Sequence, residues 1–436
     1  MLRVAAADRQ NMCRFRNHWL PDRREVPDLC GLQCSRIPGT GLCRLTSIRF
    51  DVKVPFRVHE NEMDGRVRIV HVIGALIAGG AERVAVDLVK WIHGHGIDVG
   101  LVALSPRRDV VGEAFMKELS VAGIPVDSGP TVMIGVCTVS WYAALLNSQR
   151  PTIVHLHTPN TELTHFLGTR LLIACLRPFA GKVFRTLHSM KGPRDRRWRM
   201  VYQANAAAVS IACGNAVAST YATFIRGQMN VISNGVDFAE EPRTVDSWKT
   251  ARRRLGLDET KLHFLCIGRM GGASMSASPK GHDVLLSAWK RGQCGVYGGV
   301  LHLIGDGEHR GRLERIAIGD PSIAFHGICA DTHDWLHAAD IFVLASRWEG
   351  LPVAAIEAVG LGLPCIFSDI PPFRELDPPN ARWFEVDDVA GLAAQLRQGR
   401  FELQASTVRE LEGFRDRHSV VRSARRYLEL YQANDV

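Results

Sequence analysis

The sequence predicts an α/β protein that contains two parallel sheets, and three observations carry this prediction. Short apolar runs alternate with stretches of helical spacing over most of the chain. A polar stretch, residues 240–257, interrupts this alternation, and a second series of apolar runs begins at Leu262. The chain of 436 residues is long enough for two domains with full cores. Because each helix lies between two apolar runs, each series is expected to form one parallel sheet.

The first series opens with a buried strand, Val67–Ile73, whose sequence VRIVHVI is almost continuously apolar. The glycine-rich turn Gly74–Gly80 follows it and leads into a helix expected from about Ala81 to His93. The turn lacks the GK[ST] ending of a nucleoside-triphosphate loop and the spacing of a dinucleotide site, so it supports neither. Further strands of this series are predicted at Val99–Leu104, Ile153–His157, Val183–Leu187, Val209–Cys213 and Asn230–Ser233.

The second series begins with the strand in HFLCIGRM, which ends at Gly268 and Arg269. A helix is expected at His282–Arg291, directly after Lys280 and Gly281. The next strands are predicted within Val300–Gly307 and Ile323–Gly327, and residues 331–338 should form a helix. A final amphipathic helix is expected over His418–Tyr431, because its apolar residues recur at helical spacing.

The stretch Ala339–Asp369 combines a strand, a tight turn, a helix and a second strand, with one carboxylate in the turn and one in the helix. Pro352 should open the helix, so Glu349 lies in the loop before it and Glu357 lies in its second turn. Free N–H groups at a helix start suit a phosphate, and carboxylates suit sugar hydroxyls. The pattern therefore outlines a nucleotide-sugar pocket, although two glutamates at this spacing also occur often by chance.

The residues around Glu349 and Glu357 favour a functional role for the two glutamates over a chance spacing. ADIFVL, SRWEGLP, EA and GLP, with Glu349 and Glu357, resemble the E-x7-E motif of retaining GT-B glycosyltransferases, in particular family 4 (group 1). Arg269 and Lys280 resemble the GR…KG pair of that family, GGAER at Gly79–Arg83 resembles its first glycine loop, and His188 in TLHS matches a histidine near the donor sugar. The resemblance covers about residues 65–435. It implies a GT-B architecture of two facing Rossmann-like domains with an interdomain cleft.

The resemblance also implies a role for each matched residue. Arg269 and Lys280 would bind the donor diphosphate, Glu349 the sugar hydroxyls, Glu357 the ribose, and His188 the far side of the sugar. Gly350, Leu351, Gly79 and Gly80 would complete the donor pocket. Two fixed cations can offset the charge that a nucleoside diphosphate gains as it leaves, so neither a metal nor a cofactor is expected.

The implied activity is retaining transfer of a sugar from a nucleotide-diphosphate-sugar to a glycan or polyprenyl-linked acceptor. The expected context is bacterial cell-surface polysaccharide synthesis, with front-face attack in which the donor phosphate accepts the incoming proton. Two alternatives stay open: an epimerase or phosphorylase on the same architecture, and a non-catalytic nucleotide-sugar-binding protein. No pyridoxal lysine or separate phosphate site is identifiable for a phosphorylase.

Composition limits the location and the partners of the protein. No apolar run is long enough to span a membrane, and no secretory signal is recognisable, so a cytoplasmic location is expected. Basic residues are frequent in the segment 182–200, which could contact anionic lipid at the inner face of the cell membrane or be simply a solvated surface. No nucleic-acid-binding signature accompanies them. The cysteine cluster Cys13, Cys30, Cys34 and Cys43 fits no zinc spacing.

Four segments are predicted. Residues 1–62 form an irregular leader, and one hypothesis is that translation of the native protein starts at Met63, directly before the first strand. Residues 63–238 form the acceptor-side domain and residues 239–415 the nucleotide-sugar domain. Residues 416–436 form a helix, and the resemblance implies that this helix packs back onto the first domain.

Overall fold

The computed structural model describes residues 32–36, 43–48, 67–133, 135–190, 196–223, 225, 227, 229–238, 242–399 and 407–434. The chain divides into two compact units, Met1–Gly65 and Arg66–Val436. In the first unit, strands β1 (Leu32–Arg36) and β2 (Cys43–Ile48) pair antiparallel. The rest of the expected leader, 1–62, lies outside the described residues, as does the middle of the basic segment, 191–195.

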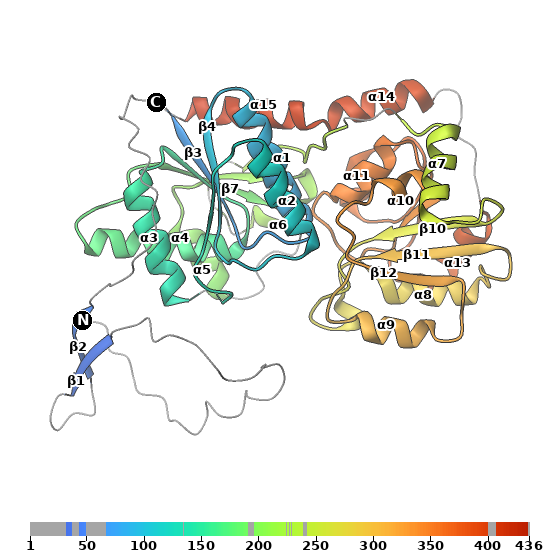
Figure 1. Ribbon diagram of the computed structural model, residues 1–436, viewed down its shortest axis with the longest axis horizontal. Helices are drawn as coiled ribbons and strands as arrows, with labels where there is room; N and C mark the ends of the chain where they lie inside the picture. Colours follow the sequence, from blue (N-terminus) through green and yellow to red (C-terminus); the bar gives the residue numbers. More distant parts are fainter. Residues whose placement is uncertain are drawn as a thin grey trace. The chain divides into compact units, whose positions relative to one another are not determined.

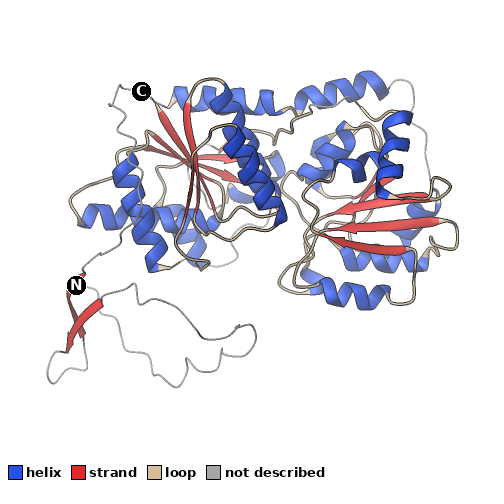
Figure 2. Cartoon of the chain, in the orientation of Figure 1, coloured by secondary structure: helices blue, strands red, loops and turns tan. Residues whose placement is uncertain are grey.

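The second unit contains the sheet of which β3, β4 and β7 are labelled in Figure 1 and whose strands are red in Figure 2. This sheet has seven strands in the order β5-β4-β3-β6-β7-β8-β9. Its strands are β3 (Arg68–Ile73), β4 (Asp98–Ala103), β5 (Val126–Ser128), β6 (Ile153–Leu156), β7 (Lys182–Leu187), β8 (Val209–Ala212) and β9 (Met229–Val231). Every neighbouring pair is parallel. The strand order reverses between β3 and β6, which is where parallel sheets bind ligands beyond their carboxyl ends.

A six-stranded sheet follows in the order β12-β11-β10-β13-β14-β15, again with parallel pairs only. Its strands are β10 (Leu262–Ile267), β11 (Gly299–Ile304), β12 (Ile323–Gly327), β13 (Ile341–Leu344), β14 (Cys365–Ser368) and β15 (Ala381–Phe384). The order reverses between β10 and β13. The two sheets confirm the predicted α/β class with two Rossmann-like domains.

Helices connect the strands of both sheets. Those of the first sheet are α1 (Gly80–Gly94), α2 (Val110–Val121), α3 (Val136–Gln149), α4 (Pro159–Ala174), α5 (Arg196–Ala204) and α6 (Asn215–Tyr221). Those of the second are α7 (Val245–Leu255), α8 (His282–Arg291), α9 (Arg310–Ala317), α10 (His333–Ala338), α11 (Val353–Gly360), α12 (Pro371–Leu376) and α13 (Val389–Arg397). α14 (Thr407–Arg417) and α15 (Val420–Ala433) end the described chain. No helix among the described residues is long and apolar enough to cross a membrane.

Helix α15 packs into the core of the first sheet, although it follows the second sheet in sequence. Tyr427 and Tyr431 are fully buried there, and their hydroxyl groups bond to Thr186 and His155 respectively. Backbone bonds between residues 236 and 418–420 join α15 to the end of the first series. Burial of two tyrosines offsets the cost of ordering the helix. The C-terminal segment therefore forms part of the first sheet's fold.

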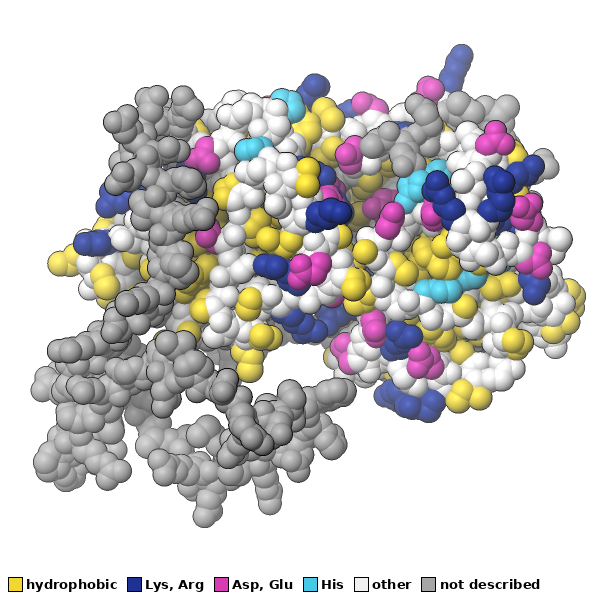
Figure 3. Space-filling model, viewed as in Figure 1, with side chains coloured by type: hydrophobic (Ala, Val, Ile, Leu, Met, Phe, Trp, Pro, Cys, Tyr) yellow, Lys and Arg dark blue, Asp and Glu magenta, His cyan; other side chains and the backbone are white. Residues whose placement is uncertain are grey.

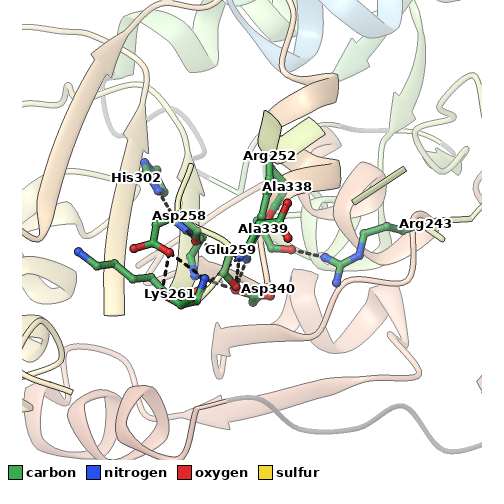
Figure 4. A network of polar contacts seen from close by, with 11 residues as sticks. Arg243, Arg252, Asp258, Glu259, Lys261, His302, Ala338, Ala339 and Asp340 are labelled. Atoms are coloured by element: carbon green, nitrogen blue, oxygen red, sulfur yellow. Dashed lines mark hydrogen bonds and ion pairs between the residues drawn. The ribbon is translucent and has the colours of Figure 1, made fainter. Parts of the chain in front are cut away.

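A buried arginine braces the second sheet (Figure 4). Arg252 points from α7 toward Asp340, with 2.5 Å between Nη2 and Oδ2, and donates to the carbonyl oxygen of Ala338 at 3.0 Å. Asp340 also accepts a bond of 2.8 Å from the backbone N–H of His263. The charge of Arg252 is thus compensated on several sides, which a fully buried guanidinium requires. Elsewhere, Figure 3 shows basic and acidic side chains interspersed over the described surface in view.

Candidate active site

The predicted site residues lie at the carboxyl ends of central strands. Arg269 follows β10, and Glu349 lies in the loop after β13, on the two strands where the second sheet reverses its order. His188 directly follows β7 of the first sheet, and Gly79 and Gly80 lie at the start of α1. This placement at the ends of parallel strands is the usual one for ligand-binding loops.

Lys280 and Glu349 form a close ion pair, with 2.7 Å between Nζ and Oε1. Ser346 donates its hydroxyl to the same carboxylate oxygen at 2.6 Å, and Ser368 in turn donates to the carbonyl oxygen of Ser346. A carboxylate can accept further hydrogen bonds beyond these two. The pair therefore presents a cation and a hydrogen-bond acceptor side by side.

Two glycines let Lys280 approach this carboxylate. A Cβ at Gly268 would lie 3.1 Å from carbons of the Lys280 side chain, so the lysine passes directly over that backbone. Gly281 has φ of +58°, and a Cβ there would meet the carbonyl oxygen of Ala345 at 1.9 Å. Only glycine suits both requirements at position 281. The long loop between β10 and Lys280 therefore ends in a fixed position.

Arg347 holds the loop between β10 and Lys280 in place, although no role was predicted for it from the sequence. Its guanidinium bonds to Asp283 at 2.8 and 3.0 Å and to the carbonyl oxygens of Met275 and Ser278. Its backbone N–H donates to the carbonyl oxygen of Pro279 at 2.7 Å. Both Arg347 and Ser346 lie within the SRWEGLP string. These partners of Arg347 lie at least 64 positions away, so the string alone could not reveal its role. Ser346 instead bonds to Glu349 within the string itself.

Arg269 is more exposed than Lys280. Its side chain is 68% accessible, and its nearest acid is Glu308, with 3.8 Å between Nη2 and Oε2. It also lowers the pKa of Glu82 in α1, although burial dominates and raises that pKa to about 7. A Cβ at Gly79 would overlap the Glu82 carboxylate, so Gly79 lies beside this group. An exposed guanidinium is available to an anionic ligand.

The loop of Glu349 contacts the first sheet directly. A Cβ at Gly350 would lie 2.0 Å from the carbonyl oxygen of His188. The N–H of Met190 donates to the carbonyl oxygen of Glu349 at 2.9 Å. Asn234 donates its side-chain amide to the carbonyl oxygen of Leu351 at 2.7 Å. These contacts bring His188, Glu349, Gly350 and Leu351 together from segments far apart in sequence.

His188 lines a cavity of about 140 Å³ together with Ala81, His157 and Glu162. Its Nε2 is 3.1 Å from Nδ1 of His157, whereas its own Nδ1 is buried and finds no hydrogen-bond partner within the described segments. Burial lowers the pKa of His188 to about 4, so the imidazole is neutral at pH 7. A neutral imidazole can donate or accept one hydrogen bond at this position.

Glu357 faces α1. Among the described residues, no hydrogen bond or ion pair joins its carboxylate to Glu349. Burial and, to a lesser degree, Asp87 raise its pKa to about 7, against an opposing contribution from Arg83. Gly80 lies on the same helix as these neighbours, and a Cβ there would contact Val353 of α11 at 3.5 Å. The structure thus pairs Lys280 with Glu349, brings the backbone of His188 against the Glu349 loop, and places Glu357 separately, in the contact between α1 and α11.

The described residues also contain a group of histidines that could hold a cation. Ring nitrogens of His71, His155 and His157 lie within 4.8 Å of one another and are buried. However, His71 and His157 already bond to each other at 2.9 Å, and His155 bonds to Tyr431 and Thr186. A cation would have to replace these hydrogen bonds. The arrangement is therefore better suited to a hydrogen-bonded network.

Comparisons with known proteins match both halves of the chain. Residues 261–399 match the family model described as Glycosyl transferases group 1, and residues 78–240 match that described as Glycosyltransferase Family 4. A relative from Escherichia coli is named UDP-Gal:alpha-D-GlcNAc-diphosphoundecaprenol alpha-1,3-galactosyltransferase. It is 23% identical over 324 residues, which are 70% of this chain and 80% of the relative.

Two further similarities concern a shorter sequence match and a solved structure. The lipopolysaccharide core biosynthesis mannosyltransferase LpsB of Rhizobium meliloti is 30% identical over 156 residues, or 34% of this chain and 42% of that protein. The crystal structure of Anabaena Alr3699/HepE in complex with UDP and glucose superposes with a TM-score of 0.69 at 16% identity. It covers 84% of this chain and 100% of its own. This structural likeness supports the fold.

Proposed function

The chain belongs to the glycosyltransferases of family 4, also described as group 1, and from this premise we propose that it moves a sugar from a nucleotide-diphosphate-sugar to a glycan or lipid-linked acceptor. One observation carries the proposal: Lys280 and Glu349 lie 2.7 Å apart, at the carboxyl ends of the two central strands of the second sheet. A cation for a leaving phosphate and an acceptor for sugar hydroxyls are thus adjacent.

The proposed chemistry follows from where charge develops. As the glycosidic bond breaks, the diphosphate gains negative charge, which Lys280 and the exposed Arg269 would offset. This division of labour needs no metal ion. Glu349 would hold hydroxyls of the sugar. His188 lies in the first domain, where its backbone contacts the Glu349 loop at Gly350, and its side chain would bond to the sugar from there.

We assign the remaining donor contacts to groups nearby. Gly350 and Leu351 offer backbone atoms beside Glu349, and Glu357 would bond to the ribose after its contact with α1 rearranges. Gly79 and Gly80 permit a close approach of ligand to the start of α1. Because Glu349 is assigned to the sugar hydroxyls rather than to attack on the anomeric carbon, retention is proposed to proceed by front-face attack. The donor phosphate then takes the proton from the acceptor hydroxyl.

We place the activity in cell-surface polysaccharide or lipopolysaccharide synthesis, at the inner face of the cytoplasmic membrane. The names of the E. coli and R. meliloti relatives support this context, since one includes a diphosphoundecaprenol-linked sugar and the other lipopolysaccharide core biosynthesis. The exposed basic residues Lys182 and Arg199, near the ends of the segment 182–200, support contact with anionic lipid. Arg185 takes no part in this contact, because it is buried and lies 3.4 Å from Glu162.

The test is release of nucleoside diphosphate from a panel of UDP-galactose, UDP-glucose and GDP-mannose, with and without a synthetic polyprenyl-diphosphate-linked GlcNAc. We expect slow release to water, faster release with an acceptor, unchanged rates in EDTA, and retained anomeric configuration in the NMR spectrum of the product. Binding without release would favour a non-catalytic nucleotide-sugar-binding protein. Neither binding nor release with any donor of the panel would overturn the proposal.

A further inference from the structure

Three imidazoles, of which His71 and His157 are buried and His188 is half-buried, form a continuous hydrogen-bonded chain that ends at the candidate active site. His71 Nδ1 lies 2.9 Å from His157 Nε2, and His157 Nδ1 lies 3.1 Å from His188 Nε2. The two outer nitrogens, His71 Nε2 and His188 Nδ1, are buried and have no hydrogen-bond partner among the described residues. The His188 end belongs to the cavity lining. Both internal pairs of nitrogens are therefore hydrogen-bonded, whereas the nitrogen at each end has no partner among the described residues.

Neutral imidazoles allow only two arrangements of protons along this chain. Burial lowers the pKa of His71 to about 3 and that of His188 to about 4, and it lowers the pKa of His157 well below its usual range. Each ring then carries one N–H, and every internal bond needs one donor and one acceptor. Consequently all three rings are Nδ1–H, or all three are Nε2–H. Only the first form offers a donor at His188 Nδ1.

A second imidazole chain in the other sheet has a fixed polarity and serves as a reference. His263 Nδ1 lies 2.8 Å from His302 Nε2, and His302 Nδ1 lies 3.0 Å from His326 Nε2. His263 Nε2 is 2.8 Å from the carbonyl oxygen of Asp258, which can only accept. Burial lowers the pKa of all three rings, so each carries one proton. The carbonyl anchor therefore fixes these three histidines as Nε2–H.

In the part of the sequence that the structure describes, the first chain of histidines has no such anchor at either end. We propose that His71, His157 and His188 form a two-state tautomer switch, in which a ligand oxygen that accepts a hydrogen bond at His188 Nδ1 converts all three rings to the Nδ1–H form. His71 is then a positioning residue that acts through His157. The inference rests on the proposed function for the identity of the ligand, an oxygen of a nucleotide-sugar.

The conversion conserves protons and charge. Going from Nε2–H to Nδ1–H, the His188 Nε2 proton moves to His157 Nδ1, and the His157 Nε2 proton moves to His71 Nδ1. One proton leaves at His71 Nε2 and one is added at His188 Nδ1, and both exchange with water during local opening of the fold. The ligand thus selects between two neutral states that differ only in the direction of the hydrogen bonds.

The experiment is two-bond proton–nitrogen NMR of the full chain labelled with ¹⁵N-histidine, which distinguishes the two tautomers. In the free protein, His71, His157 and His188 should show one common Nδ1–H fraction, whereas His263, His302 and His326 should stay Nε2–H. UDP-galactose or GDP-mannose should raise the Nδ1–H fraction of the first three together. Unequal fractions at His71 and His188, or a response at His188 alone, would overturn the proposal, as would an Nδ1–H form in the anchored chain.

An interrupted chain separates transmission from local structure. In His157→Phe, His188 should still respond to the nucleotide-sugar, but His71 should not. The matched control His302→Phe interrupts the anchored chain and should leave the His71 response intact. If His157→Phe does not fold, the equal fractions in the unaltered protein still decide the matter. If no donor shifts any histidine signal or the melting temperature, the proposed function fails, and the tautomer fractions of the free protein test the switch independently.

Discussion

Lys280 and Glu349 are 69 residues apart in sequence but pair at 2.7 Å, which joins the loop after β10 to the loop after β13. Both side chains are largely shielded, with 19% and 10% accessibility. The lysine is therefore partly neutralised in the free protein. An incoming diphosphate would compete with Glu349 for the ammonium group, and Glu349 would then be available for sugar hydroxyls. This exchange of partners underlies the first two predictions.

Replacing Lys280 by methionine removes the cation but keeps a side chain of similar length. We expect kcat to fall by about 100-fold or more, because a contact that strengthens as charge develops contributes on that scale. Donor titration and initial rates would separate kcat from KM. The control is Lys249→Met, at an exposed position on α7, which should leave both parameters unchanged. Equal rates for Lys280→Met and the unaltered protein would contradict the role of Lys280.

Ser346→Ala removes the hydroxyl that donates to Glu349 at 2.6 Å. A hydrogen bond to a charged group is worth about 1.5–3 kcal/mol, so the carboxylate should become less well positioned and kcat/KM should fall roughly 10- to 100-fold. Exposed Ser274→Ala on the preceding loop is the comparison. A loss for Ser346→Ala no larger than for Ser274→Ala would mean that the hydroxyl does not position Glu349.

Gly350→Ala tests the contact between the two sheets. Its Cβ would lie 2.0 Å from the carbonyl oxygen of His188, so the loop must move. We expect a loss of about 1–3 kcal/mol in the free energy of unfolding, together with lower activity. Urea denaturation measures the first effect. Gly94→Ala, where no atom lies within 4 Å of the added Cβ, is the control and should be neutral or slightly stabilising.

Glu357 should make stability depend on pH between about 4.5 and 7. Its pKa is raised from 4.5 to about 7, chiefly by burial, so the folded protein holds a proton that the unfolded chain releases in this window. The stability from this group is fully present below pH 4.5 and is lost as pH rises through 7. Between pH 4.5 and 8, the free energy of unfolding of Glu357→Gln should therefore fall by roughly 3 kcal/mol less than that of the unaltered protein.

Urea unfolding of both proteins at several pH values measures this difference. Comparing them cancels the opposite contributions of the buried histidines, whose pKa values are lowered. Glu314→Gln, at an exposed position on α9, should run parallel to the unaltered protein. Parallel curves for Glu357→Gln as well would show that its carboxyl group is not perturbed as described.

The sequence predicted the central strands and several helices because their signals are local. The helix His282–Arg291 has the predicted bounds, since Gly281 precedes it in a left-handed conformation and Gly292 follows it. Strands β5 and β15 were missed. Both lie at sheet edges, and most of their residues are only partly buried, so they lack the apolar run of a central strand.

The sequence predicted only those residues of the candidate site that belong to a recognisable motif. Lys280, Glu349 and His188 were identified, and the structure brings their segments together. The support from Arg347 and the chain through His71 depend on strand register and loop contacts, whereas the bond from Ser346 to Glu349 lies within the motif itself. His71 pairs with His155 across β3 and β6, a relation between residues 84 positions apart that no local pattern encodes.

The central claim is that Lys280 and Arg269 hold the donor diphosphate while Glu349 holds the sugar. A crystal structure of the full chain with a nucleotide-sugar that it binds tests this most directly. The account predicts diphosphate oxygens within hydrogen-bond distance of Lys280 Nζ and the Arg269 guanidinium, and a sugar hydroxyl on Glu349. A donor bound elsewhere, with the pair between Lys280 and Glu349 undisturbed and remote from the ligand, would contradict it.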